Sequence, residues 1–338
     1  TPYFWNIAGD KDLTLTPKFY SNENPLLLAE YRQDFLDSFL FMDVGYSKGY
    51  KKKDNKKSDG GRAHFFSKFN KSFINEEEKM SNVEVNIEKV SNDTYLKVYD
   101  IETSLAKNDK TILENKINFT YQNNDFYFGL TPSIFENTNK IGHLRDEYLL
   151  PLTIEKNILI SDKYGVLDLE SDLNLRNYEI DKQTNFFINN LNWKSNKWLS
   201  TIGVENYFEG LFKNVNYESK NVKRLKNDST NSEIHTALGY FAKLPLFKED
   251  IISKNYQSLT PKFLLRYAPG HMRATEGGRL NYGNLFNLNK LNKTDVVEPG
   301  LSSSVGFEYK KNRFNKSNII GDEVFSLSAG QVISAKEN

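Results

Sequence analysis

The sequence contains no cysteine, no excess of one charge and no long apolar run. Without cysteine, neither disulfides nor thiolate metal sites can form within these 338 residues, and the cell compartment stays open on that count. Lys and Arg number 45 against 44 for Asp and Glu, so the strongly basic surface of a nucleic-acid-binding protein is missing. No apolar run approaches the roughly 18 residues of a transmembrane helix. The chain begins without an initiator Met or a signal peptide, and we expect it to be a fragment of a longer protein.

Aromatic residues are abundant at 14%, although the mean hydropathy of -0.62 is polar. A transmembrane β-barrel explains both values, because each strand exposes apolar side chains to lipid and polar ones to a wet lumen. Strands of a soluble β-sandwich or propeller alternate in the same way, so the alternation alone hardly separates these folds. The absence of a sequence repeat favours the barrel, as do aromatic residues near strand ends, such as Trp5, Trp193 and Trp198.

Alternation with a period of two residues predicts strands along the whole chain. It is clearest over residues 167–176. Four leucines and Ser171 share one face there, and the polar residues that we expect to face the lumen occupy the other: Asp168, Glu170, Asp172, Asn174 and Arg176. Further strands are expected at residues 13–20, 26–33, 39–46, 63–73, 83–88, 117–122, 126–135, 148–159, 186–194, 202–212, 236–247, 259–267, 305–310 and 325–333.

Few residues suggest chemistry. The four histidines, at positions 64, 143, 235 and 271, are scattered and fit no metal-binding spacing. No nucleophile motif or phosphate-binding glycine motif is present. Lys51, Lys52 and Lys53 form a basic connector that could contact lipid phosphates, although solvated charge is ordinary in a connector. We therefore expect no catalytic residue, no metal and no cofactor.

The first segment predicts a hairpin whose two strands meet near Gly9 and Asp10. Pro2 and Pro17 accompany these strands, and proline cannot donate a hydrogen bond to a β-ladder. Each proline removes a bond with a net value of ~1 kcal/mol, so the pairing should open easily. The prolines therefore either protect a sheet edge from aggregation or form a functional seam.

Several segments resemble the LptD (OstA) family of lipopolysaccharide-assembly outer-membrane proteins. The resemblance rests on the order and spacing of four stretches: Pro2-Tyr-Phe-Trp-Asn-Ile-Ala with Thr14-Leu-Thr-Pro17; Asn190-Leu-Asn-Trp193; Leu259-Thr-Pro-Lys-Phe-Leu-Leu-Arg-Tyr-Ala-Pro269; and Phe325-Ser-Leu-Ser-Ala-Gly-Gln331. Residues 279–280 and 284–291 add to the match. It extends along the whole chain.

The resemblance implies a 26-stranded antiparallel outer-membrane barrel, of which residues 1–338 supply about the first sixteen strands. The periplasmic β-jellyroll and the remaining strands would lie outside this chain, and the barrel would be incomplete or open. In the family, an LptE lipoprotein plugs the lumen and an LptA-like periplasmic bridge supplies lipopolysaccharide. The lipid leaves through a lateral gate between the first and last strands, where Pro2 and Pro17 correspond to the prolines that weaken pairing.

Two other functions fit the same pattern. An outer-membrane channel or receptor for small solutes would show the same alternation, with the prolines serving only to protect an edge. A soluble all-β carbohydrate-active enzyme would need two acids in a cleft, which sequence alone does not reveal.

Overall fold

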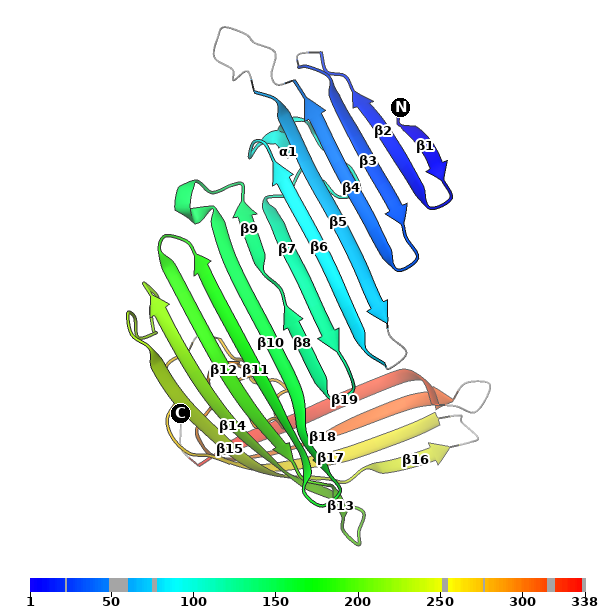
Figure 1. Cartoon of the computed structure of the whole chain (residues 1–338). Helices are drawn as coiled ribbons and strands as arrows, with labels where there is room; N and C mark the ends of the chain where they lie inside the picture. Colours follow the sequence, from blue (N-terminus) through cyan, green and yellow to red (C-terminus); the bar gives the residue numbers. More distant parts are fainter. Residues whose placement is uncertain are drawn as a thin grey trace. The chain divides into compact units, whose positions relative to one another are not determined.

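The computed structural model describes residues 1–21, 23–48, 60–74, 78–250, 255–275, 277–314 and 320–335. The expected all-β antiparallel fold is confirmed, because the described chain consists almost entirely of antiparallel strands. Strands that follow one another in sequence lie side by side (Figure 1). The strand bounds are β1 Tyr3–Ala8, β2 Lys11–Lys18, β3 Leu26–Asp34, β4 Ser38–Ser47, β5 Arg62–Ile74, β6 Met80–Val90, β7 Ile112–Gln122, β8 Phe126–Leu130, β9 Ser133–Asn137, β10 Asp146–Ser161, β11 Gly165–Tyr178, β12 Lys182–Lys194, β13 Trp198–Leu199, β14 Glu205–Lys220, β15 Asn231–Lys243, β16 Leu246–Asp250, β17 Asn255–Ala268, β18 Gly300–Phe314 and β19 Ile320–Ser334.

The chain divides into two compact units. The first contains Thr1–Ile154, Asp172–Phe186 and Glu218–Ser229, and the second contains Glu155–Ser171, Phe187–Tyr217 and Thr230–Asn338. Within the described residues, no helix is both long enough and apolar enough to cross a bilayer.

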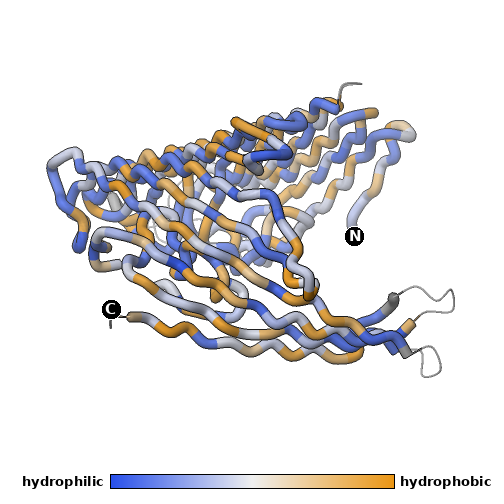
Figure 2. Tube along the Cα trace, turned by 90° about the horizontal axis from the view of Figure 1, so that it is seen from below, coloured by the Kyte–Doolittle hydropathy of each residue, from blue (hydrophilic) through white to orange (hydrophobic). Residues whose placement is uncertain are grey.

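In the first unit, each strand from β1 to β7 pairs with the next, and β9 pairs with both β7 and β10. The cross-strand registers place apolar residues opposite apolar residues and polar residues opposite polar residues. Val44 faces Phe65, and Val85 faces Ile117, whereas Glu30 faces Asp43. Hydrophilic and hydrophobic residues therefore alternate along these strands (Figure 2).

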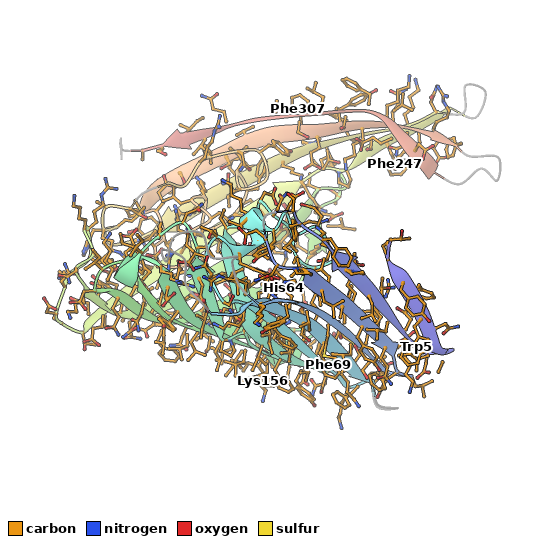
Figure 3. The ribbon with its side chains drawn as sticks, turned by 90° about the horizontal axis from the view of Figure 1, so that it is seen from above. Trp5, His64, Phe69, Lys156, Phe247 and Phe307 are labelled. Carbon is orange, nitrogen blue, oxygen red and sulfur yellow. The ribbon has the colours of Figure 1, made fainter. Side chains whose placement is uncertain are left out.

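This register gives the first unit two unlike faces. The apolar face carries Leu27, Val44, Phe65, Phe69, Val85 and Ile117, and the polar face carries Glu30, Asp43, His64, Asn86 and Glu88. Phe69 and His64, labelled in Figure 3, come from opposite faces of β5. Leu27 and Ile117 are about half exposed, although burial of such side chains would be favourable in water. Large apolar side chains thus stay uncovered across a broad area.

The polar face of the first unit is covered by the connector between β6 and β7, residues 91–111, here called the first connector. It contains the short helix α1, Tyr95–Val98. Its buried residues Tyr95, Tyr99 and Ile101 pack against Leu28 and Phe66. This packing gives the first unit its main hydrophobic core.

In the second unit, β14 pairs with β15, β15 and β16 both pair with β17, and β17 to β19 pair in order. The connector between β17 and β18, residues 269–299, is the second connector, and its Leu288 and Val297 join a core with Leu264 and Phe241. Gly306 pairs with Gly330, and a Cβ added at Gly330 would collide with Leu285 of the connector. Gly330 therefore leaves room for the second connector on this sheet.

The structure corrects several sequence-based bounds. Most strands are longer than expected, with β10 and β14 extending over 16 residues. The expected strand 126–135 is interrupted at Thr131 and Pro132, and the expected strand 236–247 is interrupted between β15 and β16. A proline without an N–H explains the first interruption. Neither α1 nor the two packed connectors were expected, because polar connector sequences carry no periodic signal.

Candidate functional site

The predicted opening hairpin is present. Five residue pairs join β1 to β2, from Tyr3 opposite Leu15 to Ala8 opposite Lys11. Pro17 lies in β2, but Pro2 lies immediately before β1 and not within it. Both prolines are beyond the last pair of this ladder, at its open end. The backbone pairing therefore stops where the two residues without an N–H begin.

Strand β1 lies at the edge of the sheet of the first unit (Figure 1). Its aromatic side chains are strongly exposed: Tyr3 by 63%, Phe4 by 58% and Trp5 by 51%. The hairpin therefore combines a short ladder with an exposed apolar surface.

The five polar residues predicted to face the lumen lie on β11. Side chains of neighbouring strands bind three of them. Thr153 donates to Asp172 at 2.7 Å, Asn190 donates to Glu170 at 3.0 Å, and Arg176 donates to Glu147 at 2.6 Å. Asp168 has a buried Oδ1 with no hydrogen-bond partner among the described residues. The row is therefore hydrogen-bonded to both neighbouring strands, and its orientation toward a lumen stays a prediction.

A buried cluster on the polar face fixes the first connector. His64 of β5 is 3.0 Å from Asp43 of β4 through Nε2 and 3.2 Å from the Tyr95 hydroxyl through Nδ1. The side chains of His64 and Asp43 are fully buried. Thr103 of the connector donates to the other carboxylate oxygen of Asp43. Because carboxylate oxygens accept hydrogen bonds, Nε2 of His64 donates to Asp43, and the contact between Nδ1 and the Tyr95 hydroxyl joins the connector to this pair.

Burial keeps the Tyr95 hydroxyl protonated. It raises the pKa of Tyr95, with neighbouring Tyr99 and Tyr20 adding to the effect. The connector is also bound at its periphery, where Tyr20 donates to the Tyr99 carbonyl at 2.8 Å and the Ser104 amide donates to Glu30 at 3.0 Å. Side chains from β3, β4 and β5 thus bind one connector.

The second connector is bound by buried cations. Arg266 of β17 donates to the carbonyls of Leu288 and Glu298, and Lys290 donates to the Ser302 hydroxyl at 2.6 Å. Lys213 of β14 donates to the Thr294 carbonyl at 2.6 Å. Burial lowers the pKa of Lys290 to about 8, helped by the charge of Arg266.

These clusters were not found from the sequence. Asp43 and His64 are 21 residues apart, and Thr103 follows Asp43 by 60 residues. Only the β4–β5 register and the folded connector bring them together. The sequence signal for such a cluster is a polar residue within an alternating strand. Every strand carries several polar residues, so this signal does not single out Asp43 or His64.

The remaining sequence-based candidates give no chemical centre. His235 of β15 lies 3.4 Å from Glu233, and no described group of three or more His, Asp or Glu residues is arranged to hold a metal ion. Lys51, Lys52 and Lys53 and the side chain of His143 lie outside the residues that the structure describes. The notable features are therefore surfaces: an apolar face, a polar face with packed connectors and an edge hairpin.

Two curated proteins are similar to this chain. It is 25% identical over 351 aligned residues to the LPS-assembly protein LptD of Pseudoalteromonas translucida, and the match covers 98% of this chain and 44% of that protein. It is 32% identical over 124 residues to the LPS-assembly protein LptD of Nitrosococcus oceani, covering 37% of this chain and 15% of that protein. No protein-family model matches the chain.

The chain spans less than half the length of the curated relatives that it matches. The first match nevertheless extends over both units and both connectors, because it leaves only 2% of the chain uncovered. The resemblance to the LptD family that the sequence motifs predicted is confirmed, at modest identity, along almost the whole chain.

Proposed function

We propose that this chain is part of an outer-membrane β-barrel that delivers lipopolysaccharide to the cell surface. The observation that carries the proposal is the similarity to two proteins named LPS-assembly protein, one of them matched over 98% of this chain. The proposed role is transport and requires no catalytic residue.

The two faces of the sheet support a membrane location. In a bilayer, the apolar face contacts lipid and leaves no unsatisfied backbone group, because the strands pair with each other. The polar face, including Asp168, Glu170, Asp172, Asn174 and Arg176, then lines a wet lumen. Such a lumen accepts the sugars of lipopolysaccharide, whose transfer into hydrocarbon would cost several kcal/mol for each unpaired polar group.

The hairpin of β1 and β2 supports a lateral gate. Lipid acyl chains need a seam between strands to reach the bilayer, and a fully paired barrel offers none. The ladder of β1 and β2 has only five residue pairs and ends before Pro2 and Pro17, so the hairpin can deform at this end. In the proposed gate, β1 separates from the last strand of the complete barrel.

The complete barrel requires strands from outside this chain. The pairs β8 and β9, β12 and β13, and β15 and β16 each share one partner strand, so the described strands fill sixteen positions. This count supports the proposal of sixteen strands in a 26-stranded barrel. An LptE-like lipoprotein would fill the lumen beside the packed connectors, and an LptA-like bridge would deliver lipopolysaccharide through a periplasmic domain.

The test is site-specific photocrosslinking in cells with the full-length protein. A photoreactive residue replaces Tyr3 or Lys18, beside the two prolines, and the control replaces Leu173 on the apolar face of β11. We expect lipopolysaccharide adducts at Tyr3 and Lys18 that exceed those at Leu173 by about tenfold, the ratio that a ~1.4 kcal/mol preference gives.

Equal adducts at all three positions would reject the gate and leave only general lipid contact. No adducts together with ion conductance in planar bilayers would favour the channel for small solutes. Soluble, monodisperse expression without detergent would reject the membrane location itself.

A further inference from the structure

On the apolar face of the first unit, an open apolar hollow lies where the sheet is interrupted. Strand β8 ends at Leu130 and β9 begins at Ser133, and Pro132 occupies the break. The Thr131 amide donates to the carbonyl of Pro151, a second proline in β10. Two neighbouring residues without an N–H weaken the ladder here and let the sheet bend.

The hollow has a volume of about 610 Å³ and is lined by apolar side chains of five strands. They include Ile87, Ile117, Ile134, Leu150 and Leu175. Ile117 is 51% exposed and Ile134 is 38% exposed, so the hollow is open to whatever surrounds the apolar face. Its size lies within the roughly 300–1,000 Å³ of pockets that hold small molecules.

A second, polar hollow of about 460 Å³ continues from the first. Tyr148, Asn177 and Gln183 line both. The polar hollow reaches the ends of the strands, where Gly142 and the turn between β11 and β12 complete it. The combined groove is therefore apolar along the strands and polar at their ends.

The charges at the polar end select the class of ligand. Lys182 pairs with Glu179 at 2.5 Å, and Lys220 pairs with Asp181 at 3.0 Å. Asp146, which also lines the hollow, pairs with Arg145 at 3.7 Å, so each carboxylate here has a cationic partner. A purely anionic headgroup would leave these acids without a partner in the ligand, whereas a zwitterion can offer its phosphate to the lysines and its amine to the acids.

Side-chain amides lie between the apolar and the polar end of the groove, and they fit the same ligand. Asn177, Gln183 and Asn185 share the apolar face with Leu175, and Gln183 donates to Asn185 at 3.3 Å. Polar groups that face hydrocarbon are costly without hydrogen-bond partners. Ester carbonyls at the junction of headgroup and acyl chains would accept hydrogen bonds from these amides.

We propose that this groove binds one zwitterionic glycerophospholipid such as phosphatidylethanolamine, with an acyl chain in the apolar hollow and the headgroup in the polar one. The proposal rests on the membrane location proposed above, but it does not need the gate or lipopolysaccharide. Binding at a kinked sheet would hold β8, β9 and β10 in register while strands elsewhere open.

The experiment is native mass spectrometry of the full-length protein, released from nanodiscs that contain equal phosphatidylethanolamine and phosphatidylglycerol. Leu175→Trp fills the apolar hollow, and Leu40→Trp places the same side chain on the apolar face outside the groove. We expect retained phosphatidylethanolamine in the unmodified protein and in Leu40→Trp, and about a tenfold loss in Leu175→Trp, equivalent to ~1.4 kcal/mol.

A second variant tests the headgroup end. Lys182→Gln with Lys220→Gln removes both phosphate partners and should lower phosphatidylethanolamine retention without affecting nanodisc insertion.

Equal retention of the two lipids, equal loss in the two tryptophan variants, or copurified lipopolysaccharide at the groove would overturn the proposal. A protein that fails to insert into nanodiscs would reject the membrane location, and lost crosslinking at Tyr3 with retained phospholipid would reject only the gate.

Discussion

At the scale of single residues, buried charge decides how the connectors are held. Removing one partner from a buried hydrogen bond to a charged group typically costs about 1–3 kcal/mol or more, because the other group stays buried without compensation. His64 with Asp43, and Arg266 with two backbone carbonyls, are contacts of this kind. Exposed pairs such as Lys107 with Glu102 are screened by water and contribute little to stability.

Lys290 makes the stability of the second connector depend on pH. Its pKa is about 8 in the folded protein, against 10.5 for an unperturbed lysine. Between these values the unfolded chain binds the proton and the folded chain does not, so stability rises with pH. Below pH 8 both states are charged, and the cost of burying the charge is fully present.

We expect the midpoint of thermal unfolding, measured in detergent with the full-length protein, to rise between pH 8 and 10 relative to Lys290→Met. Methionine keeps the length of the side chain but has no titrating group. Parallel curves for the two proteins would contradict the assignment.

At the scale of elements, the first connector works as a cover over one face of β3, β4 and β5. Beneath it, Leu28 is buried, whereas its neighbour Leu27 is half exposed on the other face. Asp43 binds both His64 and Thr103, so it joins the sheet to the connector. Loss of this carboxylate should loosen the connector while the strands stay paired.

Residues 1–338 contain no cysteine, so a cysteine introduced here is the single thiol in this part of the protein and allows a direct test. Leu28→Cys should react slowly with a water-soluble maleimide, and adding Asp43→Ala should accelerate the reaction by about a hundredfold, the effect of a ~3 kcal/mol change in an opening equilibrium. Asp125→Cys, in the exposed turn between β7 and β8, serves as the control, since its labelling should not change with Asp43→Ala. Unchanged labelling of Leu28→Cys would show that the connector is held by its apolar contacts alone.

At the scale of the whole molecule, the unlike faces determine the solvent that the fold requires. Broad apolar surfaces on a soluble monomer normally mark an interaction site, and here they extend over successive strands. In the proposed membrane location, the same surface contacts lipid tails. A charge introduced on this face should therefore prevent insertion, whereas one on the opposite face should not.

Phe69 and Asn70 are adjacent residues of β5 that test this difference (Figure 3). Phe69→Arg should reduce the yield of membrane-inserted, heat-modifiable protein severely, because arginine facing lipid at mid-depth costs about 2–4 kcal/mol. Asn70→Arg should insert normally. Similar yields for the two variants would mean that the face of Phe69 does not contact lipid.

The alternation of side chains was enough to predict the strands, since it depends only on neighbouring residues. The hairpin at Gly9 and Asp10 followed from local turn chemistry in the same way. The position of Pro2 just before β1 was not predictable, because strand ends depend on which partner residues are available. The family resemblance came from short motifs kept in order, and the relatives confirm it.

The sequence by itself therefore determined the strands, their two faces and the family resemblance, since all three are written in local order. Only the tertiary structure decided which polar residues are buried. Asp43, His64 and Thr103 meet because two strands pair in one register and a connector folds back onto them. The groove beside Pro132 likewise exists only because residues of distant strands share one face. Contacts of this kind depend on long-range packing, which leaves no periodic trace in the sequence.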